Sequence, residues 1–460
     1  MLSDKHVLIL GIGKSGLAAA ELAAANGARV TAIDQGDDDP LRERADRLSK
    51  RGAEIRLAWG DTERAPAADL AVISPGIAHD SVLGALARNV GCEIISELEL
   101  GYRYCSCPIL AVTGTNGKTT TVELLVHCLR TIGVNTMAAG NVGLPLSAIM
   151  KESATLDCAV VEVSSFQLEH VSRFQPLAAA LLNVTPDHYD RHGSHEAYLA
   201  AKLRLFANMR DGGRIVLGGS LLDDPAVVEH MHRIGGRPLV FGEAGDSRAD
   251  FVVSQEGTLV RRQPDGGKCS VLLGEDELRL PGRHNLQNLL AACALAEAAG
   301  YDPRAIAQAA RSFVPQSHRL ETVGRHDGVW FVNDSKATNP DALLQALQTI
   351  GPKISGKVWL LAGGVDKDVR FSMTTSALEK WTKGVFLMGN ARNRMAEQWK
   401  PHVSCRTFQT LESAFDAAVE ETSPGDAVLL SPGCASQDMF TDYAERGRMF
   451  CELVKRRYGE

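Results

Sequence analysis

Short apolar segments alternate with longer helical stretches along the whole chain, and this alternation restricts the fold more than any other feature. The segments HVLIL, PILAVTG, DCAVVEVSS, VWFVND and KVWLLAGG are examples. Parallel strands that helices cover on both faces have such continuous apolar runs, and the helices supply the connections between them. The pattern therefore predicts an α/β fold built on parallel sheets.

The length of the chain indicates several domains. A chain of 460 residues is too long for one hydrophobic core, and its 45% of apolar residues excludes global disorder. The apolar segments form three successive groups, which predict domains at residues 1–97, 98–315 and 316–460. Near the end of the second group, NLQNLLAACALAEAAG predicts a helix that stops at Gly300.

Charge and cysteine content exclude one class of partner and indicate a compartment. The net charge of −7 argues against nucleic acid as the main partner, and we interpret the basic clusters RGRMF and KRRYG as solvated helix faces. The ten cysteines include no C-x-x-C pair, and Cys105 and Cys107 have no zinc-ligand counterpart elsewhere. We expect buried, reduced thiols in a cytoplasmic protein. We expect neither a secretory leader nor membrane insertion, because the chain opens on a strand-like segment and has no apolar run of membrane length.

The first glycine loop, GIGKSG, lies between an apolar strand and a helix. Gly11, Gly13 and Gly16 match the dinucleotide-binding fingerprint, and Asp34 follows at the end of the next strand, RVTAID. Such a loop lets backbone N–H groups and a helix N-terminus approach phosphate. This geometry would serve NAD or NADP and any other nucleotide diphosphate equally well, and the glycines could also serve only close packing.

The second glycine loop is VTGTNGKTTT, between the strand PILAVTG and the helix KTTTVELLVHCLR. Strand, glycine loop, Lys-Thr and helix form the phosphate-loop architecture, in which Lys118 would reach the terminal phosphates and Thr119 would ligate Mg²⁺. Only Thr115 and Asn116 separate the glycine from the Gly-Lys pair, whereas the usual loop has four residues there. The position at a strand–helix junction nevertheless predicts a nucleotide site.

A series of segments resembles the motifs of the Mur ligase family, in order and at suitable spacing. The segments are TGTNGKTTT, EVSSFQLE, NVTPDHYDRHG, YLAAKLRLF, GRHNLQN, HRLE, NDSKATNP and LLSPGCASQDMF, and they cover nearly the whole chain. The pattern is most similar to the members that add D-glutamate to UDP-N-acetylmuramoyl-L-alanine in peptidoglycan synthesis. The short phosphate loop is the normal form in this family, so the resemblance favours ATP.

The resemblance implies a fold and a reaction. It implies a Rossmann-like N-terminal domain that holds UDP, a central parallel-sheet domain of the P-loop ATPase type, and a C-terminal Rossmann-like α/β domain that closes over ATP. The reaction would be ATP-dependent amide ligation through an acyl phosphate, with two Mg²⁺ ions, by a cytoplasmic monomer. The L-alanine-adding Mur ligases, an NAD-linked dehydrogenase built on GIGKSG and a nucleotide-binding switch remain the rival hypotheses.

The resemblance also implies the catalytic residues, each of which has a structural alternative. Lys118 and Thr119 belong to the phosphate loop. Glu162, after an apolar strand, would bind Mg²⁺ or would only cap the next helix. His188 would reach the second Mg²⁺ or be structural. Lys202 would carry a carbamate that helps to hold this ion, whereas the default for a lysine on an amphipathic helix is a solvated surface position.

Binding residues are implied for each substrate. ATP would contact Gly114, Thr115, Asn116, Gly117, Lys118, Thr119, Thr120, Asn285, Asn288, Arg319 and Asp334. The UDP substrate would contact Lys14, Ser15, Asp34, Gln35, Ser74, Gly76, Asn141 and Gln167. D-Glutamate would contact Lys336, Thr338, Lys367, Ser436, Gln437 and Tyr443. Gln437 stands where the family pattern has leucine, which bears on the shape of this pocket. The aspartate-asparagine-proline-arginine signature of the diamino-acid-adding members is absent from the sequence.

Overall fold

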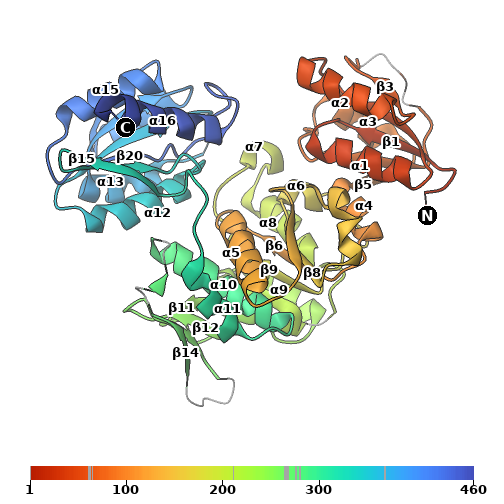
Figure 1. Cartoon of the computed structure of the whole chain (residues 1–460), viewed down its shortest axis with the longest axis horizontal. Coiled ribbons are helices and arrows are strands. Elements are labelled where there is room, and N and C mark those ends of the chain that lie inside the picture. Colours follow the sequence, from red (N-terminus) through yellow and green to blue (C-terminus); the bar gives the residue numbers. More distant parts are fainter. Residues whose placement is uncertain are drawn as a thin grey trace. The chain divides into compact units, whose positions relative to one another are not determined.

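Figure 1 shows the computed structural model, which describes residues 2–60, 64, 66–210, 212–263, 269–274, 277–278, 281–366 and 369–459. Contacts divide the chain into two compact units. The first unit contains two sheets and comprises Met1–Val184, Arg191–Glu277 and Gln287–Phe313. The second contains the third sheet and comprises Thr185–Asp190, Leu278–Leu286 and Val314–Glu460.

The first sheet has the strand order β3-β2-β1-β4-β5, and its neighbouring strands are all parallel. Its strands are β1 (His6–Leu10), β2 (Arg29–Ile33), β3 (Glu54–Arg56), β4 (Leu70–Ile73) and β5 (Glu93–Ser96). The helices are α1 (Lys14–Ala25), α2 (Asp39–Ser49), α3 (Val82–Asn89) and α4 (Glu97–Tyr104). In β1, Val7 and Ile9 join a core cluster with α1, whereas Leu8 and Leu10 join one with α3. Helices therefore cover both faces, which is why the strand sequence is apolar throughout.

The central sheet has the order β14-β13-β12-β11-β10-β9-β6-β8-β7. It is parallel from β7 to β12, and antiparallel pairing adds β13 and β14 at one edge. The strands are β6 (Ile109–Thr113), β7 (Thr136–Gly140), β8 (Cys158–Glu162), β9 (Ala178–Leu181), β10 (Ile215–Gly218), β11 (Leu239–Glu243), β12 (Phe251–Val253), β13 (Leu259–Arg261) and β14 (Ser270–Leu273). Carboxyl ends of parallel strands meet on one sheet edge, so the loops after β6, β8 and β9 lie together.

The helices around the central sheet carry clear starting signals. They are α5 (Lys118–Thr131), α6 (Ser165–Leu168), α7 (Tyr189–His192), α8 (His195–Leu203), α9 (Pro225–Ile234), α10 (Arg283–Ala298) and α11 (Pro303–Ala309), with short 3-10 turns such as η1 (Leu146–Ile149). Ser194 and Asp224 accept backbone hydrogen bonds at the N-termini of α8 and α9. Helix α10 ends just before Gly300, whose φ is +94°.

The third sheet has the order β15-β16-β20-β17-β18-β19, and only the β15–β16 pairing is antiparallel among its described pairings. Its strands are β15 (Glu321–His326), β16 (Val329–Asn333), β17 (Val358–Gly363), β18 (Thr382–Met388), β19 (Ser404–Thr407) and β20 (Ala427–Leu430). Its helices are α12 (Pro340–Ile350), α13 (Thr375–Trp381), α14 (Arg392–Trp399), α15 (Leu411–Glu421) and α16 (Tyr443–Tyr458). Alternate residues of β17 enter core clusters on opposite faces.

The predicted α/β fold with three parallel-rich sheets is confirmed, and so is the helix that stops at Gly300. Among the described helices, none is long and apolar enough to cross a membrane. The cysteines are free thiols, but the prediction that all are buried is wrong: Cys269 is exposed, and Cys92, Cys105, Cys405 and Cys451 are half-buried. Cys269 lies beside β14, which is the edge strand and therefore has a neighbouring strand on one side only.

Candidate functional site

The phosphate loop lies between β6 and α5, and its glycines are required by its geometry. Gly114 has a φ of +156° and Gly117 a φ of +83°. A Cβ added at Gly117 would lie 2.2 Å from Oδ1 of Asn288, a residue of α10. Only glycine fits this backbone at that distance. The loop thereby leads directly into the N-terminus of α5, where backbone N–H groups form a ready anion site.

Two lysine side chains meet at one carbonyl oxygen of the loop. Lys118 Nζ donates to the Gly114 oxygen at 2.9 Å and to the Thr115 oxygen at 2.8 Å. Lys202 Nζ, from α8, donates to the same Gly114 oxygen at 2.7 Å. Lys202 is only 1% exposed, so the default of a solvated surface lysine is wrong. Two ammonium groups this close to a helix N-terminus create a strongly positive site for phosphate.

Asn183, just after β9, holds the loop in place and was assigned no role from the sequence. Its Oδ1 accepts from the backbone N–H groups of Thr115 at 3.1 Å and Asn116 at 2.9 Å. Its Nδ2 donates to the Asn116 oxygen at 3.1 Å. The available signal was its position, because a polar residue directly after a strand beside the loop's own strand must lie near the loop.

Glu162 lies beside the strand that carries the phosphate loop. It ends β8, pairs in register with Val112 of β6, and is 2% exposed. Its Oε1 accepts from Asn141 Nδ2 at 2.8 Å, whereas its buried Oε2 has no hydrogen-bond partner in the described part of the chain. A buried carboxylate oxygen without a partner is costly unless a cation or donor binds there. The capping alternative is wrong, since Ser164 and Gln167 form the capping box of α6.

His188 belongs to the segment Thr185–Asp190, which groups with the second compact unit. Its backbone has a φ of +56°, which is uncommon for a residue other than glycine. Asp187 accepts from the His188 N–H at 2.9 Å, and its other carboxylate oxygen lies 3.6 Å from His188 Nε2. Asn339 Nδ2 donates to Asp187 at 3.3 Å. The imidazole therefore lies beside the Asp187 carboxylate, with about a third of its side chain exposed.

The predicted adenine-side residues lie on α10. Asn285 and Asn288 are both buried, and Asn285 Nδ2 donates to the Pro281 oxygen at 2.7 Å. Burial, and to a smaller extent the charge of Arg319, lowers the pKa of His284 to about 4. His284 is therefore neutral at physiological pH.

Asp334 and Arg319, predicted to contact ATP, belong to the third sheet's unit. The Asp334 carboxylate accepts from the Leu320 N–H at 3.1 Å and from Ser431 Oγ at 2.9 Å. Burial raises the pKa of Asp334 to about 7. Arg319 is half-buried and its charge acts on both Asp334 and His284. The structure thus brings these residues together within one unit.

The predicted D-glutamate residues differ in burial. Lys336 Nζ lies 3.7 Å from the ring centre of Tyr443, and Thr338 is half-buried. Ser436 is buried, and its Oγ has no hydrogen-bond partner among the described residues. Gln437 is exposed. Lys367 lies outside the described residues.

The interpretation of RGRMF as a solvated helix face is wrong for Arg446, which is buried. This residue of α16 is 1% exposed. Its guanidinium donates to Ser335 Oγ at 3.0 Å, to the Ser335 oxygen at 2.8 Å and to the Cys434 oxygen at 3.2 Å. Burial lowers the pKa of Arg446 to about 10. It therefore ties together the loops that carry Lys336 and Ser436.

The first glycine loop is fixed by side chains from neighbouring strands. Ser74 Oγ donates to the Gly11 oxygen at 2.7 Å, and the Asp34 carboxylate accepts from the N–H groups of Ile12 at 2.7 Å and Gly36 at 3.0 Å. A Cβ at Gly16 would lie 1.8 Å from the Gly11 oxygen. Among the other predicted UDP-side residues, Lys14, Gln35 and Gly76 are exposed and Ser15 is half-buried. Asn141 and Gln167 do not belong to this part of the chain: they follow β7 and β8 of the central sheet, where Asn141 is exposed and Gln167 is buried.

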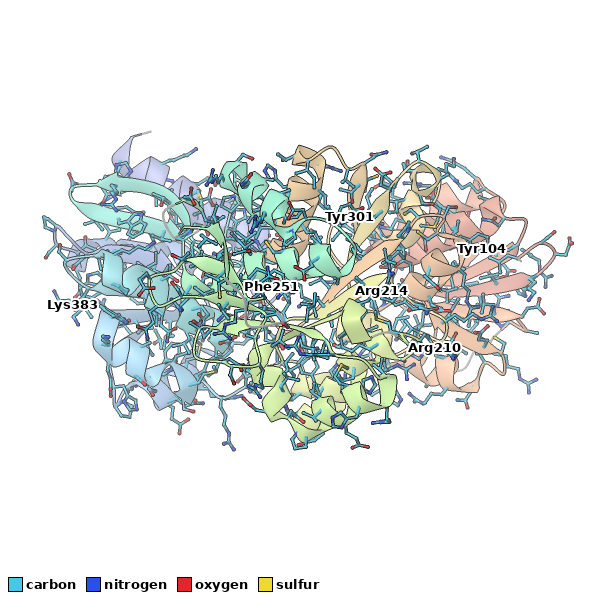
Figure 2. All side chains as sticks on the ribbon, turned by 90° about the horizontal axis from the view of Figure 1, so that it is seen from below. Tyr104, Arg210, Arg214, Phe251, Tyr301 and Lys383 are labelled. Carbon is cyan, nitrogen blue, oxygen red and sulfur yellow. The ribbon has the colours of Figure 1, made fainter. Side chains whose placement is uncertain are left out.

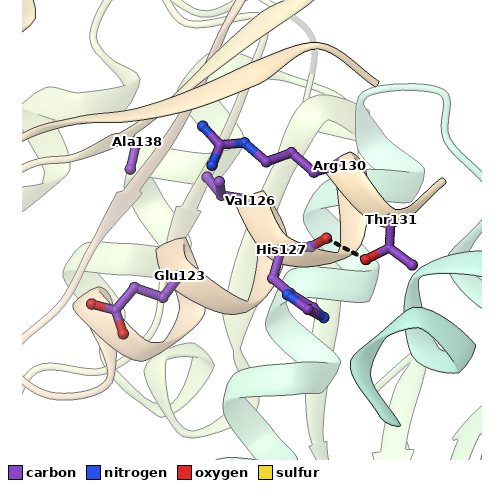
Figure 3. Close-up of a pocket in the computed structure, with 6 residues that line it drawn as sticks. All are labelled: Glu123, Val126, His127, Arg130, Thr131 and Ala138. Carbon is purple, nitrogen blue, oxygen red and sulfur yellow. Dashed lines mark hydrogen bonds between the residues drawn. The ribbon is translucent and has the colours of Figure 1, made fainter. Parts of the chain in front are cut away.

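A separate hollow of about 420 Å³ lies along α5 (Figure 3). Glu123, Val126, His127, Arg130 and Thr131 of the helix line it, together with Ala138 of β7. Thr131 Oγ1 donates to the His127 oxygen at 2.8 Å. None of these lining residues belongs to the phosphate loop, so the hollow is not part of the candidate nucleotide site.

Family models match all three parts of the chain. The MurD-like N-terminal domain of Mur ligases matches residues 5–96, the Mur ligase middle domain matches residues 112–296, and the Mur ligase glutamate ligase domain matches residues 318–434. Each match coincides with one of the three sheets.

Curated relatives match over the full length. A UDP-N-acetylmuramoylalanine–D-glutamate ligase from Pelotomaculum thermopropionicum is 38% identical over 463 residues, which cover 99% of each chain. One from Thermoanaerobacter pseudethanolicus is 36% identical over 464 residues, which cover 98% of each. The solved structure of a MurF ligase from Thermotoga maritima in complex with ADP has a TM-score of 0.60 at 19% identity, and covers 99% of this chain and 96% of that one. This last likeness concerns the fold alone.

The chain belongs to the Mur ligase family. This confirms the resemblance that the motifs indicated. It also argues against the dehydrogenase hypothesis, because the GIGKSG loop lies in the part that matches the MurD-like N-terminal domain.

Proposed function

We propose that the chain is an ATP-dependent amide ligase that joins the carboxylate of UDP-N-acetylmuramoyl-L-alanine to the amine of D-glutamate in peptidoglycan precursor synthesis. The observation that carries this proposal is the full-length match, at 36% and 38% identity, to relatives named for this activity. The phosphate loop with its two lysines supports it, because a carboxylate must be activated before an amine can attack it. We expect a cytoplasmic monomer.

In the proposed reaction, an oxygen of the substrate carboxylate attacks the terminal phosphorus of ATP, and ADP leaves. The D-glutamate amine then attacks the acyl carbon, and phosphate leaves as the amide forms. All the reactants are anionic, so the site must offset their mutual repulsion. Lys118, next to the N-terminus of α5, would bind phosphate oxygens for this purpose.

Magnesium is the cofactor that we propose beside ATP. The Oε2 of Glu162 and the hydroxyl of Thr119, both buried near the loop, would hold one ion, and His188 and a carbamate on Lys202 a second. Bound magnesium neutralises phosphate charge. No three His, Cys, Asp or Glu side chains within the described ranges form a metal-binding group, so hydroxyl, carbamate and phosphate oxygens would complete the coordination. A high-resolution map of CO₂-equilibrated, ATP-bound crystals that shows a bare Lys202 ammonium would contradict the carbamate.

The two remaining substrate sites follow the predicted residues. The loop fixed by Ser74 and Asp34 would hold the UDP part of the substrate. The loops that Arg446 ties together would bind D-glutamate through Lys336 and the buried Ser436 hydroxyl. Thr338, Lys367, Gln437 and Tyr443 complete this proposed set.

The test is phosphate release from Mg-ATP and UDP-N-acetylmuramoyl-L-alanine, with D-glutamate compared with L-glutamate, L-alanine and meso-diaminopimelate. We expect release only with D-glutamate, and a product whose mass is that of the amide. Release with UDP-N-acetylmuramate and L-alanine instead would favour the L-alanine-adding rival. Binding of ATP with no release under any condition would favour a switch.

Lys118→Ala tests the assignment of the phosphate loop. We expect it to abolish ATP turnover without unfolding the protein, because it removes a positive charge from the nucleotide site. Lys151→Ala, at an exposed lysine outside the site, is the control and should retain activity. Normal turnover in Lys118→Ala would contradict the assignment.

A further inference from the structure

A cavity of about 580 Å³ opens at the end of the central sheet opposite the phosphate loop. It is lined by residues that precede β6, β9 and β10, among them Tyr102, Cys105, Cys107, Gln175, Arg210 and Arg214. The phosphate loop follows the carboxyl end of β6, whereas this cavity lies at its amino end. Its volume is typical of small-molecule sites. It is therefore a second concave site, separate from the candidate nucleotide site.

Two thiols lie together in the wall of this cavity. Cys105 is half-buried directly after α4, Cys107 is buried two residues later, and their sulfur atoms are 3.7 Å apart. The hydrogen bond with Cys107 lowers the pKa of Cys105. The same contact, together with burial, raises the pKa of Cys107. Cys105 is thus the nucleophile of the pair, since the thiolate is the reactive form, and Cys107 is a nearby second thiol.

Two arginines give the cavity its charge. Arg210 and Arg214 are exposed and line the same cavity, and Figure 2 labels both side chains. Guanidinium groups bind carboxylates, and their combined field raises the local concentration of anions. Neither the thiols nor these arginines take part in the proposed ligation. The cavity therefore combines a reactive thiol, a second thiol and attraction for acidic small molecules.

We propose that Cys105 and Cys107 form a thiol–disulfide exchange site for a small acidic disulfide of the glutathione type. The Cys105 thiolate attacks one sulfur of the disulfide, the S–S bond breaks, and the departing thiolate takes a proton from water. Cys107 then gives its proton to water, and its thiolate attacks the Cys105 sulfur. The mixed S–S bond breaks, and the second departing thiolate takes a proton from water. The protein has lost two electrons and two protons, and the disulfide has become two thiols.

The experiment uses the full chain with Cys269→Ser, because Cys269 is an exposed thiol that would react independently. The reduced protein is incubated anaerobically with oxidised glutathione, and the masses of its proteolytic peptides are measured by mass spectrometry. We expect the peptide containing both thiols to lose two hydrogens, and Cys107→Ser to accumulate the mixed disulfide at Cys105. Cys92 is the matched control, since it is also half-buried but its pKa is raised by burial. Cys105 should react on the order of tenfold faster than Cys92.

The charge of the site is tested by Arg210→Gln combined with Arg214→Gln. The reaction with oxidised glutathione should slow roughly tenfold at low ionic strength, whereas that with the uncharged 2-hydroxyethyl disulfide should not change. Equal slowing with both disulfides, or none, would overturn the specificity for acidic disulfides. Failure of the Cys269→Ser protein to form the internal disulfide would overturn the site itself, whatever the ligase assay shows.

Discussion

Asn183 shows how much one side chain can contribute to a nucleotide site that it need not touch. It makes three hydrogen bonds to the backbone of Thr115 and Asn116. We expect Asn183→Ala to weaken ADP binding roughly tenfold or more, because each lost hydrogen bond is worth about 1 kcal/mol and the loop must then be ordered by the ligand. Isothermal titration calorimetry measures this.

Asn208→Ala is the matched control for this prediction. Asn208 Nδ2 donates to the Ser172 and Phe174 carbonyl oxygens, so its loss removes backbone hydrogen bonds outside the phosphate loop. Its removal should lower stability and leave ADP affinity unchanged. Equal ADP affinity in the Asn183 and Asn208 variants would contradict the positioning role of Asn183.

The buried carboxyl of Glu97 should make the stability of the protein depend on pH. Burial raises its pKa to about 7 in the folded chain, although its carboxylate accepts from the Ser147 N–H at 2.6 Å. Between its ordinary value and 7, the folded state retains a proton that the unfolded state has lost, so stability falls as pH rises through this window. Between pH 5 and pH 8, the free energy of unfolding should therefore fall by up to about 3 kcal/mol less in Glu97→Gln than in the unmodified protein. Urea unfolding at the two pH values measures this difference.

Glu99→Gln provides the comparison for Glu97. The Glu99 carboxylate accepts from the backbone N–H groups of Ser172, Arg173 and Phe174 and from the Arg103 guanidinium. Its neutralisation should destabilise the protein at pH 8, where Glu97→Gln should stabilise it. If Glu97→Gln instead destabilised the protein at pH 8, the interactions of the ionised Glu97 carboxylate would outweigh the free-energy cost of burying it.

At the scale of elements, the junction between the phosphate loop and α5 depends on the packing of α10. Gly117→Ala would force alanine into a positive φ and would also place its Cβ against Asn288. Gly133→Ala, just after α5, would meet only the first of these costs, because Gly133 has a φ of +90° and no atom lies within 4 Å of the added Cβ. The Gly133 variant should lose about 1 kcal/mol of stability and bind ADP normally. The Gly117 variant should lose more stability and also ADP affinity, measured by calorimetry. Normal ADP binding by both variants would contradict the close fit of the two elements.

The elements could be predicted from the sequence because their signals are local. Apolar runs, glycines and capping residues indicated the strand β6, the loop and the start of α5 at Lys118. Burial of a charged side chain is a tertiary property, and local patterns could not indicate it. Arg446 and Lys202 both lie on helices with ordinary polar surfaces, but carbonyl oxygens from distant loops accept their hydrogen bonds and make burial possible. The role of Asn183 was different, because its place just after β9, the strand beside the loop's own strand, was a signal that the sequence contained.

At the scale of the whole molecule, the proposed site draws on both compact units. The phosphate loop lies in the first unit, and Asp334 and Lys336 lie in the second. We propose that both units bind the reactants, and that bound substrates favour a closed state that excludes water from the acyl phosphate. We expect small-angle scattering to show a smaller radius of gyration with an ATP analogue and UDP-N-acetylmuramoyl-L-alanine than without them. Identical profiles would contradict closure.

The Gly114 carbonyl oxygen, which two ammonium groups share, makes nucleotide binding an exchange of partners. The ammonium groups already donate hydrogen bonds to this carbonyl oxygen. An anion can therefore bind them only by replacing the carbonyl oxygen as their acceptor. A small anion that reaches one donor gains little from this exchange, whereas a triphosphate that engages both Lys118 and the helix N-terminus gains several bonds at once. The Gly114 carbonyl oxygen therefore competes with incoming anions for the same N–H donors. We expect this competition to prevent small cellular anions from binding at the site.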